Sequence, residues 1–234
     1  MRVLAIGCHP DDMEICCSGT LAKCVRRGDT VIACHVANGD KGHVVVMPKE
    51  LADIRRQEAI DAGALAGIEV LSCEVPDLMV DSHDLQQRDA VVDVIRYAKP
   101  DFIITMAPND YMKDHNETSL LVFDATFAAT VPHYVTKYPA IDQLAPIYYM
   151  DAVNGLGDQP TIYVDISDTI DLKMEMLRKH ESQVKWLMDH DHVDFVERTK
   201  AINRFRGIQC GVEYAEGFTQ CMAGLRPTTK RYLP

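Results

Sequence analysis

Short apolar runs alternate along this chain with longer stretches in which apolar residues recur at helical spacing. This alternation is typical of βαβ units, in which crossover helices join parallel strands. Most of the short runs are apolar at nearly every position, as expected for strands covered by helices on both faces. The pattern therefore predicts an α/β fold with a doubly wound, mostly parallel sheet and helices on both faces. The predicted strands are residues 3–7, 30–36, 69–73, 101–106, 147–150 and 161–165.

The longer stretches predict helices between these strands. Pro48 suits a first helical turn, and Gly28 and Gly67 suit helix ends. Two further helices follow the last predicted strand and either pack over the sheet or form a partner surface. The tail from Gly207 onward shows no clear pattern. The predicted helices are residues 19–27, 48–65, 85–98, 116–129, 168–189 and 193–205.

Composition narrows the class of protein. A chain of 234 residues with 47% hydrophobic and 25% charged positions can bury one core, so we expect a single domain over residues 1–234. No apolar run approaches the length of a membrane span, and no partner membrane is expected. A formal net charge of −11 argues against nucleic acid, which binds through clustered Lys and Arg. A small-molecule partner is therefore expected.

The first residues and the cysteines predict a cellular location. The chain opens directly on a predicted strand and lacks the features of a secretory signal peptide. Its eight cysteines include the adjacent Cys16 and Cys17 and no paired C-x-x-C spacing, which favours reduced thiols over a disulfide framework. Both observations predict a cytoplasmic protein.

Chemistry is concentrated directly after the first predicted strand. His9, Asp11, Asp12 and Glu14 place one imidazole and three carboxylates within six residues. Neighbouring carboxylates repel, and a bound divalent cation lets several of them ionise together. This indicates a metal site. The alternative is a solvated turn in which Asp11 or Asp12 caps the next helix.

A second polar cluster, Asp110, Asp114 and His115, follows the fourth predicted strand. In doubly wound sheets, ligands bind outside the carboxyl ends of the strands where the strand order reverses. If the fourth strand lies beside the first, His9, Asp12 and His115 converge at that point. Three ligands of His and Asp type leave a coordination position for water, as in catalytic zinc sites. The two clusters therefore predict a metal-dependent hydrolase.

These residues carry a resemblance to a known family. The sequence His-Pro-Asp-Asp at residues 9–12, with Glu14 two positions on and Asp-His at residues 114–115, resembles the PIG-L/LmbE family of zinc-dependent N-acetylglucosaminyl deacetylases. The resemblance spans most of the chain. Further segments similar to the family are residues 36–40, 54–58, 180–183, 206–207 and 211–216.

The resemblance implies a Rossmann-like sheet with zinc held by His9, Asp12 and His115. It also implies that Asp11 is the general base, with Asp114 beside the zinc ligand as a second catalytic candidate. The chemistry of the residues agrees, because a carboxylate near a metal site can take a proton from water as it attacks an amide carbonyl. The expected products are acetate and a free amine.

The same resemblance implies substrate contacts. Arg55 is expected to contact the substrate, and Arg56 beside it is an alternative. Either arginine could instead form only a salt bridge at the surface. Asp40, in the loop after the second strand, is a further candidate, as are Tyr111 and Met112. The expected substrate is an N-acylated amino sugar or a related small molecule.

The resemblance also bears on the metal and the assembly. His and carboxylate ligands accept Zn²⁺, Fe²⁺, Co²⁺ or Mn²⁺ according to availability, and zinc is the metal expected here. A ring-like homo-oligomer, a trimer or hexamer, is expected as well.

One departure from the family changes the functional expectation. The family loop usually carries a histidine that stabilises the oxyanion, and this chain has Met112 there. Tyr111, Lys113 and His133 are alternative donors. Metal binding is expected to survive, and three functions stay open. They are a deacetylase, a hydrolase of another amide or conjugate, and a weakened binding or regulatory protein that keeps the metal.

Two further features are expected to be structural. The cluster Asp-His-Asp-His at residues 189–192 falls between two predicted helices and is expected to be a solvated loop. Cys8 flanks a predicted ligand, but its side chain is expected on the opposite face of the strand as a buried neutral thiol.

Overall fold

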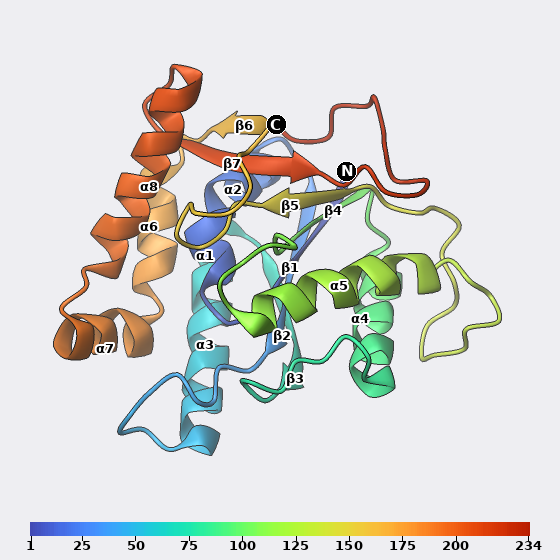
Figure 1. Cartoon of the computed structure of the whole chain (residues 1–234), viewed down its shortest axis with the longest axis horizontal. Coiled ribbons are helices and arrows are strands. Elements are labelled where there is room, and N and C mark those ends of the chain that lie inside the picture. Colours follow the sequence, from blue (N-terminus) through green and yellow to red (C-terminus); the bar gives the residue numbers. More distant parts are fainter.

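A computed structural model describes all residues from 1 to 234, and its strands form one mixed sheet (Figure 1). The strand order is β3-β2-β1-β4-β5-β7-β6. Strands β1 to β5 run parallel, and β7 runs antiparallel to both β5 and β6. The predicted fold class is confirmed. The strands are β1 (Arg2–Gly7), β2 (Thr30–Ala37), β3 (Glu69–Val75), β4 (Phe102–Thr105), β5 (Ile147–Met150), β6 (Ile162–Asp165) and β7 (Ala215–Gln220).

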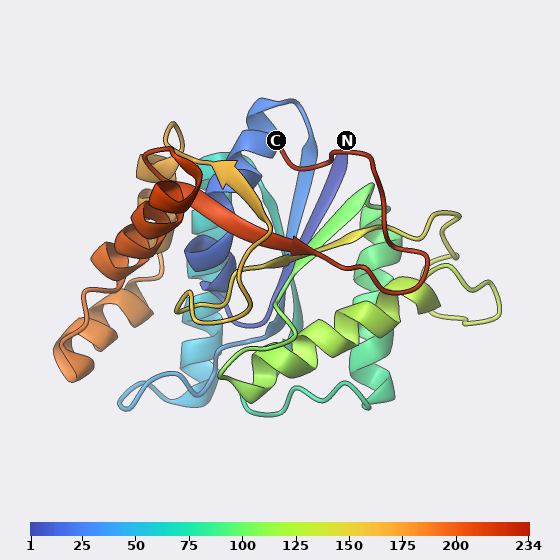
Figure 2. The ribbon, with the colours of Figure 1, turned by 45° about the horizontal axis from the view of Figure 1, so that its top comes forward.

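Helices cover both faces of this sheet. Helices α4 and α5 pack together on one face, whereas α1, α2, α3 and α6 lie on the other (Figures 1 and 2). None of the helices has both the length and the hydropathy needed to span a bilayer. The helices are α1 (Asp12–Cys16), α2 (Ser18–Arg26), α3 (Pro48–Ala66), α4 (Leu85–Ala98), α5 (Lys113–Ala128), α6 (Ile170–Arg178), α7 (Glu181–Asp191) and α8 (Phe195–Cys210).

The strand order reverses at β1, and this reversal positions the chemistry. Strand β1 pairs with β2 along one edge and with β4 along the other. Ile6 lies opposite Thr105, so the two strands end at the same level of the sheet. The loops that follow β1 and β4 therefore begin side by side at the carboxyl edge. The predicted convergence of the two polar clusters required this pairing of β1 with β4.

Strand β7 was not predicted from the sequence. It lies between β5 and β6 and contains Glu216, a charged residue that is buried. Because this charged residue interrupts the apolar run, the pattern of apolar residues does not predict the strand. Glu216 pairs with buried Lys173 at 2.5 Å and accepts hydrogen bonds from the backbone N–H groups of Gly19 and Thr20. A carboxylate at a helix N-terminus satisfies donors that have no partner within the helix. The Glu216 side chain thus links β7 to both α6 and α2.

The predicted single helix over residues 168–189 is wrong, because the structure divides it into α6 and α7. The break falls at His180, whose side chain is fully buried and lies 3.3 Å from Glu14. A contact with a distant part of the chain therefore interrupts the helix at a point where the spacing of apolar residues predicts that it continues. The predicted loop at residues 189–192 is also corrected, since Asp191 ends α7 and the cluster is an exposed helix end.

The buried Lys173–Glu216 pair gives a stability prediction. Replacing Glu216→Ala leaves a buried ammonium without its carboxylate, and breaking such a pair typically costs about 3–5 kcal/mol. We expect the free energy of unfolding, measured by urea denaturation, to fall by that amount. The matched control is Glu181→Ala, which breaks the exposed pair with Lys185 and should leave the midpoint nearly unchanged. Equal midpoints for both variants would contradict the prediction.

Candidate metal centre

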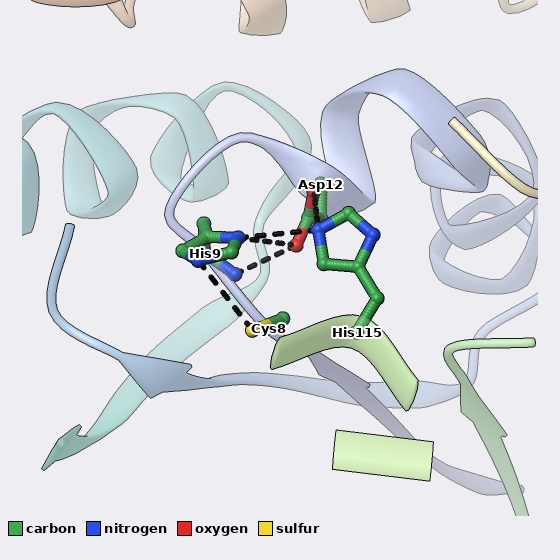
Figure 3. A group of neighbouring side chains, drawn as sticks. All are labelled: Cys8, His9, Asp12 and His115. Carbon is green, nitrogen blue, oxygen red and sulfur yellow. Dashed lines mark hydrogen bonds and ion pairs between the residues drawn. The ribbon is translucent and has the colours of Figure 1, made fainter. Parts of the chain in front are cut away.

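Three donor side chains meet at the carboxyl edge of β1 and β4. His9 lies in the loop after β1, Asp12 begins α1, and His115 lies in the first turn of α5. His9 Nδ1 lies 3.2 Å from His115 Nε2. The Asp12 carboxylate oxygens lie 3.5 Å from each of these nitrogens. Figure 3 shows the three side chains pointing toward one another from separate elements.

These separations fit a bound divalent metal. In a tetrahedral zinc site with bonds of about 2.0–2.1 Å, two donor atoms lie about 3.3–3.4 Å apart. The three measured separations, from 3.2 to 3.5 Å, agree with that spacing. Asp12 and His115 are both buried. His9, Asp12 and His115 would supply three ligands, which leaves a fourth position in a tetrahedral site.

Further carboxylates hold the two imidazoles. His115 Nδ1 lies 3.1 Å from Asp110 Oδ1, and His9 Nε2 lies 3.6 Å from Asp114 Oδ2. The nitrogens that face these carboxylates are the ones turned away from the common centre. Such outer partners fix the tautomer and the ring orientation of metal-binding histidines. Asp114 does not line the cavity, and its Oδ2 also accepts a hydrogen bond from the Leu78 N–H.

Asp11 has a strained backbone and a shifted acidity. Its φ of 126° lies outside the regions that residues other than glycine usually adopt. Its side chain makes no capping hydrogen bond to α1, so the capping alternative is wrong for this residue. Burial raises the pKa of Asp11 to about 6, against the opposing effect of Arg55 at 3.2 Å. Strain of this kind persists where surrounding structure enforces it, typically at functional sites.

Asp12 has the opposite shift. Burial alone raises the pKa of a carboxyl group, but the charges of His115 and His9 and the hydrogen bonds from His9 outweigh it. The pKa of Asp12 therefore lies well below its usual range. The two adjacent carboxyl groups differ in acidity, and only Asp12 is firmly held in the charged form.

The structure separates the two neighbouring arginines. Arg55 is buried, lines the cavity and donates hydrogen bonds to the carbonyl oxygens of Pro10 and Gly39 at 2.5 and 3.3 Å. Gly39 has a φ of 74°, and a Cβ there would lie 2.6 Å from Arg55 Nε. Arg56 instead forms surface bonds to Glu74. Of the two candidates, Arg55 is the one at the site.

Asp40 does not line the cavity, whereas the unpredicted Asp77 does. Asp40 accepts a hydrogen bond from the Asp77 N–H at 2.9 Å, and Asp77 accepts one from the Gly39 N–H at the same distance. The two residues tie the loops after β2 and β3 together, and Asp77 reaches to 3.8 Å from His9 Nε2. The available signal was its position in the segment that follows the third predicted strand, whose carboxyl end lies at this edge.

The three donors lie in a cavity of about 550 Å³. Tyr111 and Met112 form part of its wall, which is the position expected of residues that contact the substrate. Their roles stay predictions. The opposite wall comes from the segment after β5 and from α7 and α8. These later elements were predicted as helices without a link to the site. They supply Val153, Asn154, Gln183, Trp186, Leu187, Asp191, Val193, Phe195 and Arg198.

The expected direction of Cys8 is wrong. Its Sγ lies 3.7 Å from His9 Nε2, beside the centre and not on the far face of the strand (Figure 3). The strand has already ended at Gly7, so the alternation of side chains no longer applies. The thiol is buried, and burial raises its pKa. Cys8 Sγ belongs to the same group of candidate donor atoms as His9, Asp12 and His115.

Fold and site together define an α/β protein with a candidate metal centre at the point where its strand order reverses. Residues 4–126 match the family model described as PIG-L, GlcNAc-PI de-N-acetylase. The chain belongs to this family of de-N-acetylases, as its resemblance to PIG-L/LmbE proteins predicted.

Two archaeal deacetylases are similar to most of the chain. The diacetylchitobiose deacetylase of Thermococcus kodakarensis is 27% identical over 92% of this chain and 81% of that protein. The N,N'-diacetylchitobiose deacetylase of Pyrococcus horikoshii, solved with an inhibitor, is 25% identical and has a TM-score of 0.82. That match covers 97% of this chain and 87% of the solved one.

A protein with a different reaction shares the fold. The 4-carboxy-2-hydroxymuconate hydratase GalB of Pseudomonas putida is 20% identical, with a TM-score of 0.82 over the full length of both chains. At this identity the likeness concerns the fold alone. The side chains at the site, and not the architecture, therefore decide the reaction.

The donor geometry gives a prediction about metal content. We expect the purified protein to hold a divalent ion. His115→Ala removes a ligand, so it should lower the metal affinity by more than the 10- to 100-fold that is typical when a residue hydrogen-bonded to a ligand is lost. The measurement is metal analysis after dialysis against a graded chelator. His133→Ala, an exposed histidine outside the cavity, is the control. Equal metal retention by both variants would exclude this centre.

Proposed function

We propose that the protein is a metal-dependent hydrolase that removes an acyl group, acetyl in the simplest case, from an N-acylated amino sugar or related small molecule. The observation that carries the proposal is the set of His9, Asp12 and His115 donor atoms at metal-ligand spacing, with the Asp11 carboxylate in the same cavity. The two similar archaeal proteins are named as deacetylases of an N-acetylated sugar, which supports this reaction.

The proposed metal is zinc, and Fe²⁺, Co²⁺ or Mn²⁺ suit the same ligands. When bound, a divalent cation supplies a Lewis acid that polarises a carbonyl group and lowers the pKa of water. The proposed ligands are His9, Asp12 and His115. The cytoplasmic location, the single-domain boundaries and the trimeric or hexameric homo-oligomer stay predictions of the sequence.

Asp11 is proposed as the proton carrier. Its carboxylate takes a proton from the attacking water as the C–O bond forms at the amide carbonyl. It then gives that proton to the nitrogen as the C–N bond breaks, which leaves acetate and the amine. Arg55, at 3.2 Å, holds the carboxylate in place and in turn is fixed by two backbone carbonyl groups.

The outer carboxylates have a positioning role in this proposal. Asp110 faces His115, and Asp114 faces His9, each on the nitrogen opposite the donor centre. Asp114 was a catalytic candidate in the sequence, but it does not line the cavity. We therefore assign it the orientation of His9 and not a direct proton transfer.

Tyr111 is the proposed substitute for the oxyanion-stabilising histidine that Met112 replaces. Of the alternatives Tyr111, Lys113 and His133, only Tyr111 lines the cavity. Its ring meets that of His115 edge-on with the centroids 6.1 Å apart, next to the donor centre. A phenolic hydroxyl group can donate a hydrogen bond to a developing oxyanion, whereas a thioether cannot.

The proposal predicts that Asp11→Asn abolishes turnover without releasing metal. The amide cannot accept the proton, and loss of a general base typically costs about 10²- to 10⁴-fold in rate. Acetate release from a panel of N-acetylated amino sugars measures the effect, and metal analysis of the same sample serves as the control. Full turnover by the Asp11→Asn variant would refute the assignment of Asp11.

The assignment of Tyr111 has its own test. Tyr111→Phe removes the hydroxyl group alone, and loss of one oxyanion donor typically lowers kcat by about 10²- to 10³-fold. The matched control is Tyr97→Phe, which removes a hydroxyl group on the surface that donates to Glu69. Unchanged kcat in Tyr111→Phe would show that the oxyanion is stabilised by another group.

A further inference from the structure

Arg198 is a cation of the cavity wall that lacks an acidic partner. It lies in the first turn of α8 and donates a hydrogen bond to the side-chain oxygen of Asn154, a neutral group. The other two cationic side chains of the wall are matched by carboxylates. Arg55 lies 3.2 Å from Asp11, and Lys41 lies 2.8 Å from Asp40.

Among the three arginines of α8, only Arg198 has no carboxylate partner. Arg204 lies 3.6 Å from a Glu213 carboxylate oxygen, and Arg206 lies 2.6 Å from one of Asp151. An exposed arginine is often only a solvated surface group, but this one lines the cavity that holds the donor centre.

Arg198 also lies within electrostatic reach of the reacting region. Tyr111, His9 and Arg198 line the same cavity, and the charges of His9 and Arg198 both oppose the burial that raises the pKa of Tyr111. Val193 and Phe195 line the same cavity with apolar side chains. A cationic group in the wall of a cleft attracts anions more strongly than one on a convex surface, because the low-dielectric walls focus its field.

We infer that Arg198, steadied by Asn154, binds an anionic group of the substrate, a carboxylate or a phosphate. The inference rests on the proposed function and narrows its substrate class to acidic N-acylated compounds. The hydrogen bond to Asn154 restrains the guanidinium group and leaves its remaining N–H donors available. The planar fork of these donors matches the paired oxygens of a carboxylate or phosphate.

Binding is tested first, in an Asp11→Asn background that does not turn over. The probes are N-acetylglucosamine, its 6-phosphate and N-acetylmuramic acid, which carry no charge, a phosphate and a carboxylate. Calorimetry should show at least one acidic probe binding about 10- to 100-fold more tightly than the neutral one, as a charged hydrogen bond predicts. The acidic probe that binds more tightly identifies the anion as phosphate or carboxylate.

Substitutions then assign the preference to Arg198. Arg198→Gln should abolish it by weakening the acidic probes alone, and Arg198→Lys should retain part of it, because lysine keeps the charge without the fork. The matched control, Arg204→Gln, removes an arginine of the same helix outside the cavity and should retain the full preference. Equal binding of neutral and acidic probes, or an equal effect of Arg198→Gln on both, would overturn the inference.

Turnover by the otherwise native protein separates this inference from the proposed function. For an acidic substrate, Arg198→Gln should raise KM about 10- to 100-fold with little change in kcat, since a contact to a non-reacting anion binds the substrate and the transition state alike. If no probe releases acetate while the Arg198-dependent preference persists in calorimetry, the deacetylase proposal fails and the anion site stands. If acetate is released without any such preference, the anion site fails and the deacetylase stands.

Discussion

The parallel pairing of β1 with β4 is the constraint on which the site depends. It places the ends of two strands, nearly a hundred residues apart in sequence, at the same level of the sheet. His9 and Asp12 follow one strand and His115 follows the other, so their donor atoms meet without a long loop. Both strands are buried in the core, and the packing that fixes the sheet therefore also fixes the separations within the centre.

The carboxylates around this centre are costly to bury without compensating positive charge. Asp110 and Asp114 orient the two imidazoles, and the Asp40–Asp77 contacts hold the neighbouring loops. Buried acidic groups in such number repel one another unless positive charge compensates them. The same physical logic explains why Asp11 and Asp12, although adjacent, differ in acidity. Asp12 faces the histidines, whereas Asp11 is buried beside a single arginine.

The half of the chain that matches the family model supplies the candidate metal ligands, whereas the C-terminal half supplies much of the cavity wall. The family model covers residues 4–126, which include all three donor residues. The opposite wall of the cavity comes from later elements, among them Trp186 of α7 and Arg198 of α8. A hydratase with the same fold shows that the architecture alone does not select a reaction. Substrate choice in this chain is therefore to be sought in its later helices.

The sequence by itself determined the fold class, six of the strands and the family, because apolar runs and the His-Pro-Asp-Asp motif are local signals. Only the tertiary structure revealed β7 and the break at His180, since each depends on a buried polar contact between distant segments. It also replaced Asp40 by Asp77 in the cavity wall and brought Arg198 to the site. Such positions are decided by how loops and helices pack, and periodicity along the chain carries no information about that packing.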